Sequence, residues 1–345
     1  MRVTDKSFGG GNQFSNNLHA YLNKHGHEVI DHLNDDDIDV IILTDPRAFI
    51  KSSAYTLNDV SNYLRSRKNP PFVFHRINEC DERKGTRFMN SQLELANRLA
   101  DHTIYIASWL IDLFKKQNLK FTDTYSTILN GADASSFVKK KKELKEGQKI
   151  RFVTHHWSAN LMKGWDVYMA IEERLKADPE FDKKFEFWYI GNAPTDLKIE
   201  KIKLLPPCTG KELGKKLGEC DFYLTASICE PGGMHHVEGG MSGLPIVYRD
   251  SGALPEYCHE YGVEFKGKDD VFDAIEELVN NFDKYSEKMV TYDRSAEKMC
   301  SLYMKAFEDC LELQKKKTKK PSLIEKFYIL FMSHSFRVLA KLGFH

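Results

Sequence analysis

The chain reads Cys229-Glu230-Pro231-Gly232-Gly233-Met234-His235-His236-Val237-Glu238-Gly239-Gly240 just after the apolar run Phe222-Tyr223-Leu224-Thr225-Ala226. The apolar run is typical of a buried strand, and the stretch from about residue 236 to residue 242 is typical of the start of a helix. A strand, a glycine-rich turn and a helix therefore follow one another here. Doubly wound parallel sheets are built from this unit.

Two carboxylates, Glu230 and Glu238, lie eight positions apart around the glycine-rich turn. The first N–H groups of a helix lack partners within the helix and suit phosphate oxygens, whereas carboxylates accept hydrogen bonds from sugar hydroxyls. A turn with both features predicts a nucleotide-sugar site, with the diphosphate on the amides and the sugars on the acids. The alternative is an ordinary strand-to-helix turn in which Glu238 caps the helix.

The chain continues as Gly243-Leu244-Pro245-Ile246-Val247-Tyr248 and Ser251-Gly252-Ala253-Leu254-Pro255-Glu256. Together with residues 229–240, these residues resemble the Glu-x7-Glu region of family 4 glycosyltransferases over about thirty consecutive positions. The resemblance implies the GT-B fold, which is two Rossmann-like doubly wound parallel-sheet domains facing each other across a cleft. It also implies a retaining enzyme that transfers a sugar from a nucleotide-sugar donor to a hydroxyl of a glycan, a lipid-linked sugar or a glycoconjugate, as in polysaccharide or glycoconjugate biosynthesis.

The resemblance assigns roles to individual residues. Glu230 would bind hydroxyls of the transferred sugar and support charge at its reacting carbon, and Glu238 would take the ribose hydroxyls. The leaving diphosphate would be carried by Lys163 and by backbone N–H groups of Gly233, Met234 and His235. No second carboxylate is an obvious nucleophile, so front-face attack is favoured over a covalent intermediate.

Lys163-Gly164 follows Thr154-His155-His156-Trp157-Ser158-Ala159-Asn160 and opens the first helix of the predicted second domain. Members of the family usually place an arginine and a lysine here to neutralise the diphosphate. This chain has the lysine, but Ser158 stands where the arginine is expected. That change would weaken donor binding unless Asn160 or His156 compensates. The alternative places Lys163 on a solvated helix face.

The first half opens with Ser7-Phe8-Gly9-Gly10-Gly11-Asn12-Gln13-Phe14, which resembles the N-domain loop of these glycosyltransferases. Gly10 and Gly11 would let the backbone approach a phosphate or an acceptor, whereas a plain turn is the alternative. The strand before this loop would be short, because only Val3 is clearly apolar.

His75 follows the predicted strand Phe72-Val73-Phe74 and matches the histidine that related enzymes place near the donor sugar and acceptor. A hydrogen-bonded structural histidine is the alternative. Arg76 would hold a charged acceptor group or pair with Glu79 or Asp81, and the sequence does not separate these possibilities.

Apolar runs alternate with helical periodicities along the whole chain, which predicts parallel sheets in two domains. We expect an acceptor-side domain over residues 1–140 and a nucleotide-sugar-binding domain over residues 148–312. The charged run from Lys139 to Gly147 would link them. Residues 313–345 would form a basic and apolar helical tail, which either contacts an anionic membrane surface through residues 315–342 or docks on the first domain.

The composition excludes several classes of protein. The 345 residues are 41% hydrophobic and 29% charged, which is typical of a soluble globular protein. Fifty basic and fifty acidic residues cancel, so no nucleic-acid partner is expected. The first residues lack the apolar segment of a secretory signal, and seven irregularly spaced cysteines suit reduced thiols, so a cytoplasmic location is expected.

Four histidines in adjacent pairs, at 155, 156, 235 and 236, raise the question of a metal site. Neighbouring residues on a strand point in opposite directions, and the spacing is not that of a helical zinc site. We therefore expect neither a metal ion nor another cofactor. Two further functions stay open: a GT-B epimerase, for which Glu79 and Asp81 are the only candidate acid/base groups, and a catalytically silent carbohydrate-binding subunit, which Ser158 would suit.

Overall fold

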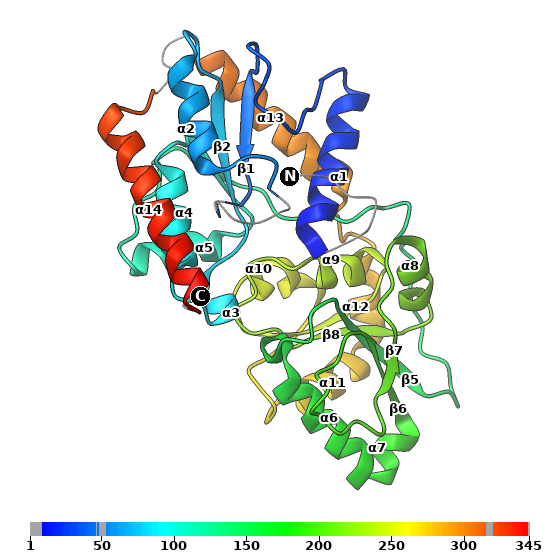
Figure 1. The fold of residues 1–345 in the computed structure, drawn as a ribbon. Coiled ribbons are helices and arrows are strands. Elements are labelled where there is room, and N and C mark those ends of the chain that lie inside the picture. Colours follow the sequence, from blue (N-terminus) through cyan, green and yellow to red (C-terminus); the bar gives the residue numbers. More distant parts are fainter. Residues whose placement is uncertain (1–8, 46, 48–52, 315–319, 344–345) are drawn as a thin grey trace. The chain divides into compact units, whose positions relative to one another are not determined.

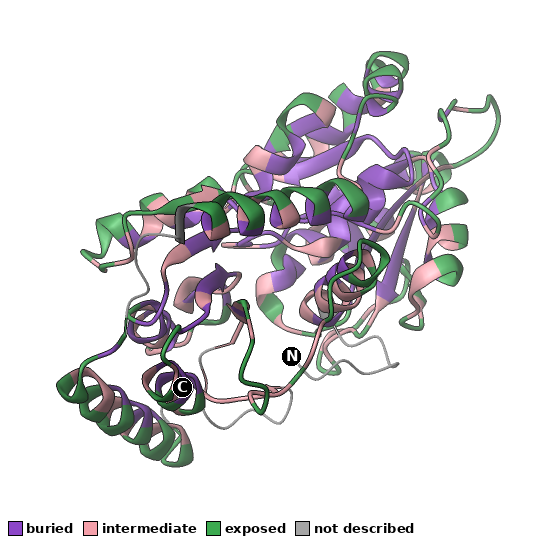
Figure 2. Ribbon diagram, turned by 90° about the horizontal axis from the view of Figure 1, so that it is seen from above, coloured by how far each residue is buried: buried purple, intermediate pink, exposed green. Residues whose placement is uncertain are grey.

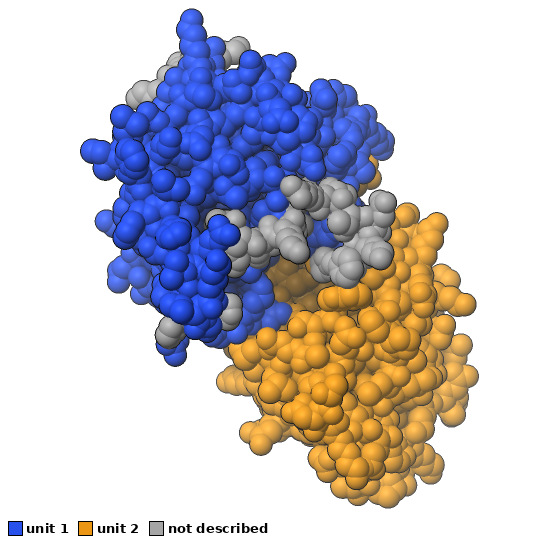
Figure 3. All heavy atoms as spheres, in the orientation of Figure 1, with its two compact units in different colours: residues 1–6, 11–129, 299–345 blue, residues 7–10, 130–298 orange. Residues whose placement is uncertain are grey.

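The computed structural model describes residues 9–45, 47, 53–314 and 320–343 (Figure 1). The expected strand at Val3, the first two residues of the Ser7–Phe14 segment and Lys315–Lys319 lie outside these residues. The chain forms two compact units, coloured separately in Figure 3. Unit 1 comprises residues 1–6, 11–129 and 299–345, and unit 2 comprises residues 7–10 and 130–298.

Unit 1 contains a parallel sheet of four strands in the order β1-β2-β3-β4. The strands are β1 (Val40–Leu43), β2 (Phe72–Ile77), β3 (His102–Tyr105) and β4 (Tyr125–Thr127). The helices are α1 (Gly9–Lys24), α2 (Leu57–Ser66), α3 (Asp81–Lys84), α4 (Met89–Asn97), α5 (Ser108–Lys116), most of α13 (Ala296–Gln314), and α14 (Leu323–Lys341).

Unit 2 contains a parallel sheet of six strands in the order β10-β9-β8-β5-β6-β7. The strands are β5 (Ile150–His156), β6 (Phe185–Gly191), β7 (Lys203–Leu205), β8 (Phe222–Thr225), β9 (Ile246–Arg249) and β10 (Gly262–Phe265). The helices are η1 (Leu161–Lys163), α6 (Trp165–Ala177), α7 (Pro179–Lys184), α8 (Gly210–Gly218), α9 (Met234–Met241), α10 (Leu254–Cys258), η2 (His259–Tyr261), α11 (Val271–Asn280) and α12 (Phe282–Met289).

The strands form where apolar runs can be buried on both faces of a sheet. In unit 2 the rings of Phe152, Phe187 and Phe222 come from three neighbouring strands and stack with centroids 4.6 and 5.0 Å apart. All three are buried, and Figure 2 shows buried strands beneath helices whose outer sides are exposed. Burying each phenylalanine contributes about 1.5–3 kcal/mol. The predicted α/β class with two parallel sheets is confirmed.

One local prediction needs correction. The strand predicted to end at Phe74 continues to Ile77, so His75 lies inside β2 and pairs in register with Leu43 and Thr103. Arg76 belongs to the same strand; its guanidinium is buried over the ring of Phe14, 3.8 Å from the centroid, and donates to Tyr303 Oη. A cation packed on an aromatic face can be buried within a strand.

The chain passes between units at positions other than the predicted ones. Residues 139–147, predicted as a linker, belong to unit 2. Lys139 Nζ donates to Tyr292 O, and Lys142 Nζ donates to Gly218 O at the end of α8. A lysine suits Gly218 O because the last turn of a helix leaves its carbonyls without partners within the helix. Residues 299–312 return to unit 1, because Met299, Tyr303 and Phe307 pack with the core around Phe74.

Candidate functional site

The candidate site lies where the strand order of unit 2 changes direction. The chain builds β5, β6 and β7 outward to one side, then returns to place β8 against β5 and continues outward through β9 and β10. In open parallel sheets, ligands bind beyond the carboxyl ends of the strands at such a switch point. The loops after β5 and β8 carry Lys163 and residues 229–240. The fold therefore brings the two predicted motifs to the same edge.

Glu230 and Lys163 form a buried ion pair at this edge. Lys163 Nζ lies 3.1 Å from Glu230 Oε2, and the side chains are only 11% and 4% exposed. Lys163 ends η1, and the next residue, Gly164, has a φ of 100°. A Cβ at Gly164 would lie 2.4 Å from Ala226, so only glycine lets this corner approach the end of β8. The alternative of a solvated Lys163 is wrong.

The loop 251–253 holds the backbone of Glu230. Ala253 N donates to Glu230 O at 2.7 Å, and Cys229 N donates to Ser251 Oγ at 2.9 Å. Gly252 presses against the same segment, because a Cβ there would lie 2.5 Å from Glu230 N and O. Cys229 has a φ of 48°, a left-handed conformation that non-glycine residues adopt only at a cost. This loop therefore determines where the Glu230 carboxylate points.

The amino end of α9 offers main-chain donors next to Glu230. Gly233 is the N-cap residue, and no side chain among the described residues caps the helix there. The N–H groups of the first turn, which include those of Met234 and His235, thus have no partner within the helix. A Cβ at Gly233 would lie 3.0 Å from the Glu230 carboxyl carbon, so glycine keeps these N–H groups close to the acid. This arrangement suits an anion beside the Lys163–Glu230 pair.

Glu238 lies one turn further along α9 and is 3% exposed. Its Oε2 is 2.6 Å from His155 Nε2, while Oε1 is buried and has no hydrogen-bond partner among the described residues. Tyr223 Oη accepts from His155 N and lies 3.1 Å from His155 Nδ1. Both ring nitrogens of His155 are thus engaged, Nδ1 by Tyr223 and Nε2 by Glu238. Glu238 is held through one oxygen and leaves the other for a ligand.

The other three histidines of the pairs are part of the core. His235 Nε2 is 2.9 Å from Thr225 Oγ1, and His156 Nε2 is 3.0 Å from Tyr168 Oη. His236 packs edge-on against Tyr257, with ring centroids 4.9 Å apart, and neither ring nitrogen has a hydrogen-bond partner among the described residues. The side chain of His235 therefore faces the strand, and only its backbone N–H serves the amino end of α9.

Burial keeps several histidines neutral. It lowers the pKa of His236 and of His75 to about 3 and that of His235 well below 6.5, since the charged form would lose its hydration. In the unfolded chain these histidines titrate near the usual value, about 6.5. Between pH 6.5 and 5 the unfolded state therefore binds more protons than the folded state.

We expect the free energy of unfolding to fall as the pH drops through this window, by about 1.4 kcal/mol per pH unit for each such histidine. Urea unfolding at pH 7.5, 6.5 and 5 measures the slope. His236→Phe should reduce the pH dependence of the unfolding free energy by the contribution of close to one proton. His27→Asn, a change at an exposed position, should leave that pH dependence unaltered. An unchanged slope in His236→Phe would show that His236 takes up its proton in the folded protein.

No described contact joins His75, Ser158 or Gly11 to this site. His75 lies in unit 1, where its Nδ1 accepts from Asn97 Nδ2 at 3.1 Å; its Nε2 has no partner among the described residues. Ser158 is exposed and accepts from Asn160 N. Gly10 and Gly11 lie in the first turn of α1, and Gly10 approaches Met234, since a Cβ at Gly10 would lie 2.8 Å from Met234 Cγ. The catalytic role of His75 and the donor-binding roles of Ser158, Gly10 and Gly11 stay predictions.

Asn160 and His156, which were suggested to compensate for the missing arginine, make hydrogen bonds to nearby residues. Asn160 caps η1 through the Met162 N–H at 2.8 Å, and His156 is bonded to Tyr168. The residues that the sequence missed are His155 and Tyr223, which hold Glu238, and Asn130, whose Nδ2 donates to Gly232 O at 2.6 Å. His155 was visible as a polar residue near the end of a predicted strand. No short sequence pattern around Tyr223 or Asn130 identifies either one as a residue of the site.

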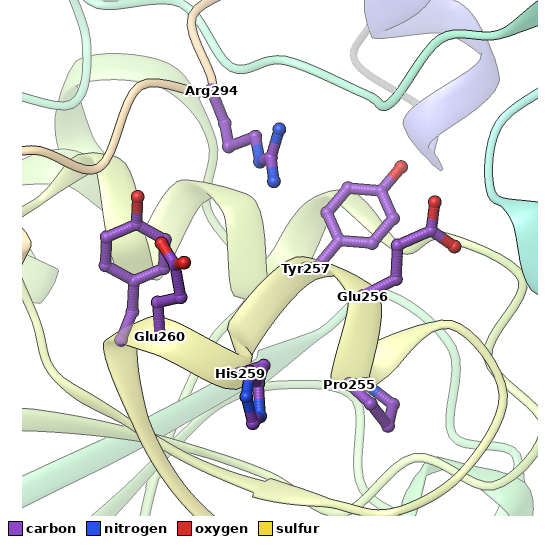
Figure 4. Close-up of a pocket in the computed structure, with 7 residues that line it drawn as sticks. Pro255, Glu256, Tyr257, His259, Glu260 and Arg294 are labelled. Atoms are coloured by element: carbon purple, nitrogen blue, oxygen red, sulfur yellow. The ribbon is translucent and has the colours of Figure 1, made fainter.

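A cavity of about 440 Å³ lies elsewhere on unit 2, over α10 and η2 (Figure 4). Arg294 points into it, with Cζ 5.9 Å from the centroid of the Tyr257 ring. Its other lining residues are Pro255, Glu256, His259, Glu260 and Tyr261. Neither Glu230, Glu238 nor Lys163 lines this cavity. The chemistry of the buried acids and the strand order, and not cavity size, locate the candidate site.

No protein-family model matches this sequence, and no curated protein matches it either. Solved structures nevertheless resemble it. Sucrose-phosphate synthase from Thermosynechococcus elongatus superposes with a TM-score of 0.59 and 11% identity, covering 91% of this chain and 83% of that enzyme. HepE from Anabaena, solved in complex with UDP, superposes with a TM-score of 0.58 and 13% identity, covering 79% of each chain.

The pneumococcal O-GlcNAc transferase GtfA, solved in complex with UDP and GlcNAc, has a TM-score of 0.57 and 16% identity. The match covers 85% of this chain and 60% of that one, so the chain spans less than two thirds of the length of this neighbour. The neighbours include GT-B glycosyltransferases, and the predicted GT-B fold class is confirmed. At such identities the likeness establishes the fold alone, because one fold hosts many functions.

Proposed function

We propose that this protein is a retaining glycosyltransferase that moves a sugar from a nucleotide-sugar donor to an acceptor hydroxyl. One observation supports this function above all. The switch point of unit 2 gathers two buried carboxylates, a buried lysine and a helix amino end, and within the described part of the chain no side chain caps that helix and one buried oxygen of Glu238 has no hydrogen-bond partner. A nucleotide-sugar matches each of these features, since it has a ribose, a diphosphate and a second sugar.

The diphosphate would lie on the N–H groups of Gly233, Met234 and His235 and on Lys163. The ammonium group has three donors, so Lys163 can keep its bond to Glu230 Oε2 and donate to a phosphate oxygen as well. Stabilising the charge that develops on the leaving group is usually the largest contribution to catalysis. These groups would therefore act without a metal ion or another cofactor.

Glu230 would hold hydroxyls of the transferred sugar and support positive charge at its reacting carbon. Its carboxylate pairs with Lys163, and the loop 251–253 holds its backbone in place. His75 keeps its proposed role near the transferred sugar; Asn97 Nδ2 donates to its Nδ1, which leaves the proton of the neutral ring on Nε2. The acceptor would be a hydroxyl of a glycan, a lipid-linked sugar or a glycoconjugate.

An epimerase is the less suitable function. Its acid/base groups were expected at Glu79 and Asp81, and both carboxylates take part in structural contacts. Asp81 accepts from Thr86 Oγ1 and from the N–H groups of Met89 and Asn90, at 2.6 to 3.0 Å, while Glu79 pairs with Lys84. Carboxylate oxygens engaged in these contacts are not available to take a proton from a substrate.

Incubation with a panel of nucleotide-sugars tests the proposed reaction. We expect slow release of a nucleoside diphosphate from one donor, faster when the acceptor is present, with the product keeping the donor's anomeric configuration by NMR. Interconversion of the free nucleotide-sugar would instead show an epimerase. Binding without either reaction would show a silent subunit.

Glu238→Gln should mainly raise the donor KM, by about 10- to 100-fold, and change kcat by only a few-fold. The ribose lies away from the reacting carbon, so its contacts stabilise ground state and transition state alike. Losing one charge-assisted hydrogen bond costs about 1.5–3 kcal/mol. Initial rates over a range of donor concentrations measure both constants. Glu264→Gln, the same change at an exposed carboxylate of β10, serves as the control. A loss confined to kcat would assign Glu238 to the chemical step instead.

A further inference from the structure

The last helix of the chain, α14, has two apolar faces, and only one of them is covered. Ile329 and Phe336 are buried in the unit 1 core formed with α2 and α4, and α14 lies along these helices (Figure 1). Its first turn is anchored by a capping box between Ser322 and Glu325 and by Arg65, which donates to Pro321 O at 2.7 Å. The rotation of α14 about its own axis is therefore set by unit 1.

The opposite face carries a stripe of large apolar side chains. Ile324, Phe327 and Phe331 are 83%, 64% and 68% exposed, and Val338 and Leu342 continue the row at 41% and 67%. These positions recur at three-, four- and seven-residue spacings, so they share one side of the helix. Eight of the fifteen large apolar residues exposed in the described chain lie between 323 and 342. Such a concentration marks an interaction surface.

The charge beside this exposed stripe is strongly positive. From residue 315 to the end, the sequence has eight lysine or arginine residues and one glutamate, while the preceding 314 residues have forty-two basic and forty-nine acidic residues. Within the described part of this segment, Lys326, Arg337 and Lys341 fall on the side of α14 between the covered face and the stripe, by helical periodicity. A chain without net charge thus gathers an excess of basic residues in the segment that carries this apolar stripe.

This combination distinguishes between possible occupants. A second copy of α14 would bring equal positive charges together, which opposes pairing. No helix among the described residues is long and apolar enough to cross a membrane. A helix lying in the interface of a bilayer instead places apolar side chains at the acyl boundary and cations at lipid phosphates.

We infer that α14 docks this protein on an anionic lipid surface, with Ile324, Phe327, Phe331, Val338 and Leu342 inserted and Lys326, Arg337 and Lys341 at the headgroups. This surface lies on unit 1 and is independent of the proposed reaction. Docking would hold the protein where lipid-linked acceptors are present.

Vesicle flotation of the full chain tests this inference without any activity measurement. We expect the protein to bind phosphatidylcholine vesicles that contain 40% phosphatidylglycerol, and to bind pure phosphatidylcholine vesicles at least tenfold more weakly. Binding to the anionic vesicles should weaken in about 0.5 M NaCl, because salt at this concentration screens the attraction between the lysines and the lipid phosphates. Phe327→Ser/Phe331→Ser should reduce binding at least tenfold. Leu204→Ser/Val290→Ser, which alters two exposed apolar side chains in unit 2, should leave binding unchanged.

The triple variant Lys326→Gln/Arg337→Gln/Lys341→Gln should bind the anionic vesicles more weakly. Its weak binding to neutral vesicles should not change. Thermal unfolding checks that each variant is folded. Failure of the wild-type chain to float with anionic vesicles overturns the inference, and so does undiminished binding of the folded Phe327→Ser/Phe331→Ser variant. A dimer in light scattering that this variant abolishes, without vesicle binding, would assign the stripe to a second copy.

Discussion

Glu230→Gln is expected to reduce kcat by at least about a hundredfold while the protein stays folded. Glutamine keeps the shape of the side chain and can still accept from Lys163 Nζ, which lies 3.1 Å from Oε2 in the native protein. It removes the negative charge that would support the reacting carbon, and an electrostatic contact made in the transition state is typically worth a factor of 10²–10³. Glu230→Ala should abolish transfer altogether.

Transfer rates with saturating donor, together with thermal unfolding, check this result. Glu276→Gln, on the exposed side of α11, is the matched control and should retain full activity. A Glu230→Gln enzyme that is as active as the wild type would refute the assignment of the site, whatever the state of the fold.

Lys163→Met should affect both activity and stability. Methionine fills a similar volume but leaves the buried Glu230 carboxylate without the cation beside it, and removing one partner of a buried pair costs about 3–5 kcal/mol. The diphosphate would lose its charged side-chain contact, so kcat should fall at least about a hundredfold. Urea unfolding and transfer assays measure the two effects separately.

The double variant Lys163→Met/Glu230→Gln separates the two roles of the pair. Because the remaining carboxylate becomes a neutral amide, we expect much of the lost stability to return while transfer stays abolished. If stability and activity recover together, Lys163 acts only through the fold. If Lys163→Met keeps the wild-type kcat, the lysine has no part in stabilising the leaving group.

Much of the local structure was predictable from short stretches of sequence. The apolar run at 222–226 is strand β8 to within one residue, the run at 72–74 begins β2, and the helix expected after the glycine-rich turn is α9. The helical spacing of Phe14, Leu18 and Leu22 agrees with α1, in which these side chains are buried. Such predictions succeed because apolar periodicity and glycine positions act over a few residues.

Errors arose where distant residues change the meaning of a local signal. The strand predicted over residues 72–74 continues through Arg76, because Phe14 and Tyr303 bury its side chain from other parts of the chain. The lysines at 139–142 were predicted as a linker because the run is charged and lacks apolar periodicity, whereas Lys142 reaches Gly218 O. Residues 299–312 were predicted with the second domain and group with unit 1 in the structure, since their periodicity does not say which sheet they cover.

By itself, the sequence determined the strand, turn and helix that carry Glu230 and Glu238, because these elements depend on residues close together in the chain. Only the tertiary structure decided that β8 lies against β5, and strand order depends on packing between segments that no local pattern records. That neighbour brings Lys163 to Glu230 across 67 positions and His155 to Glu238 across 83. The buried ion pair, and the Glu238 oxygen that no described residue contacts by a hydrogen bond, are consequences of that pairing.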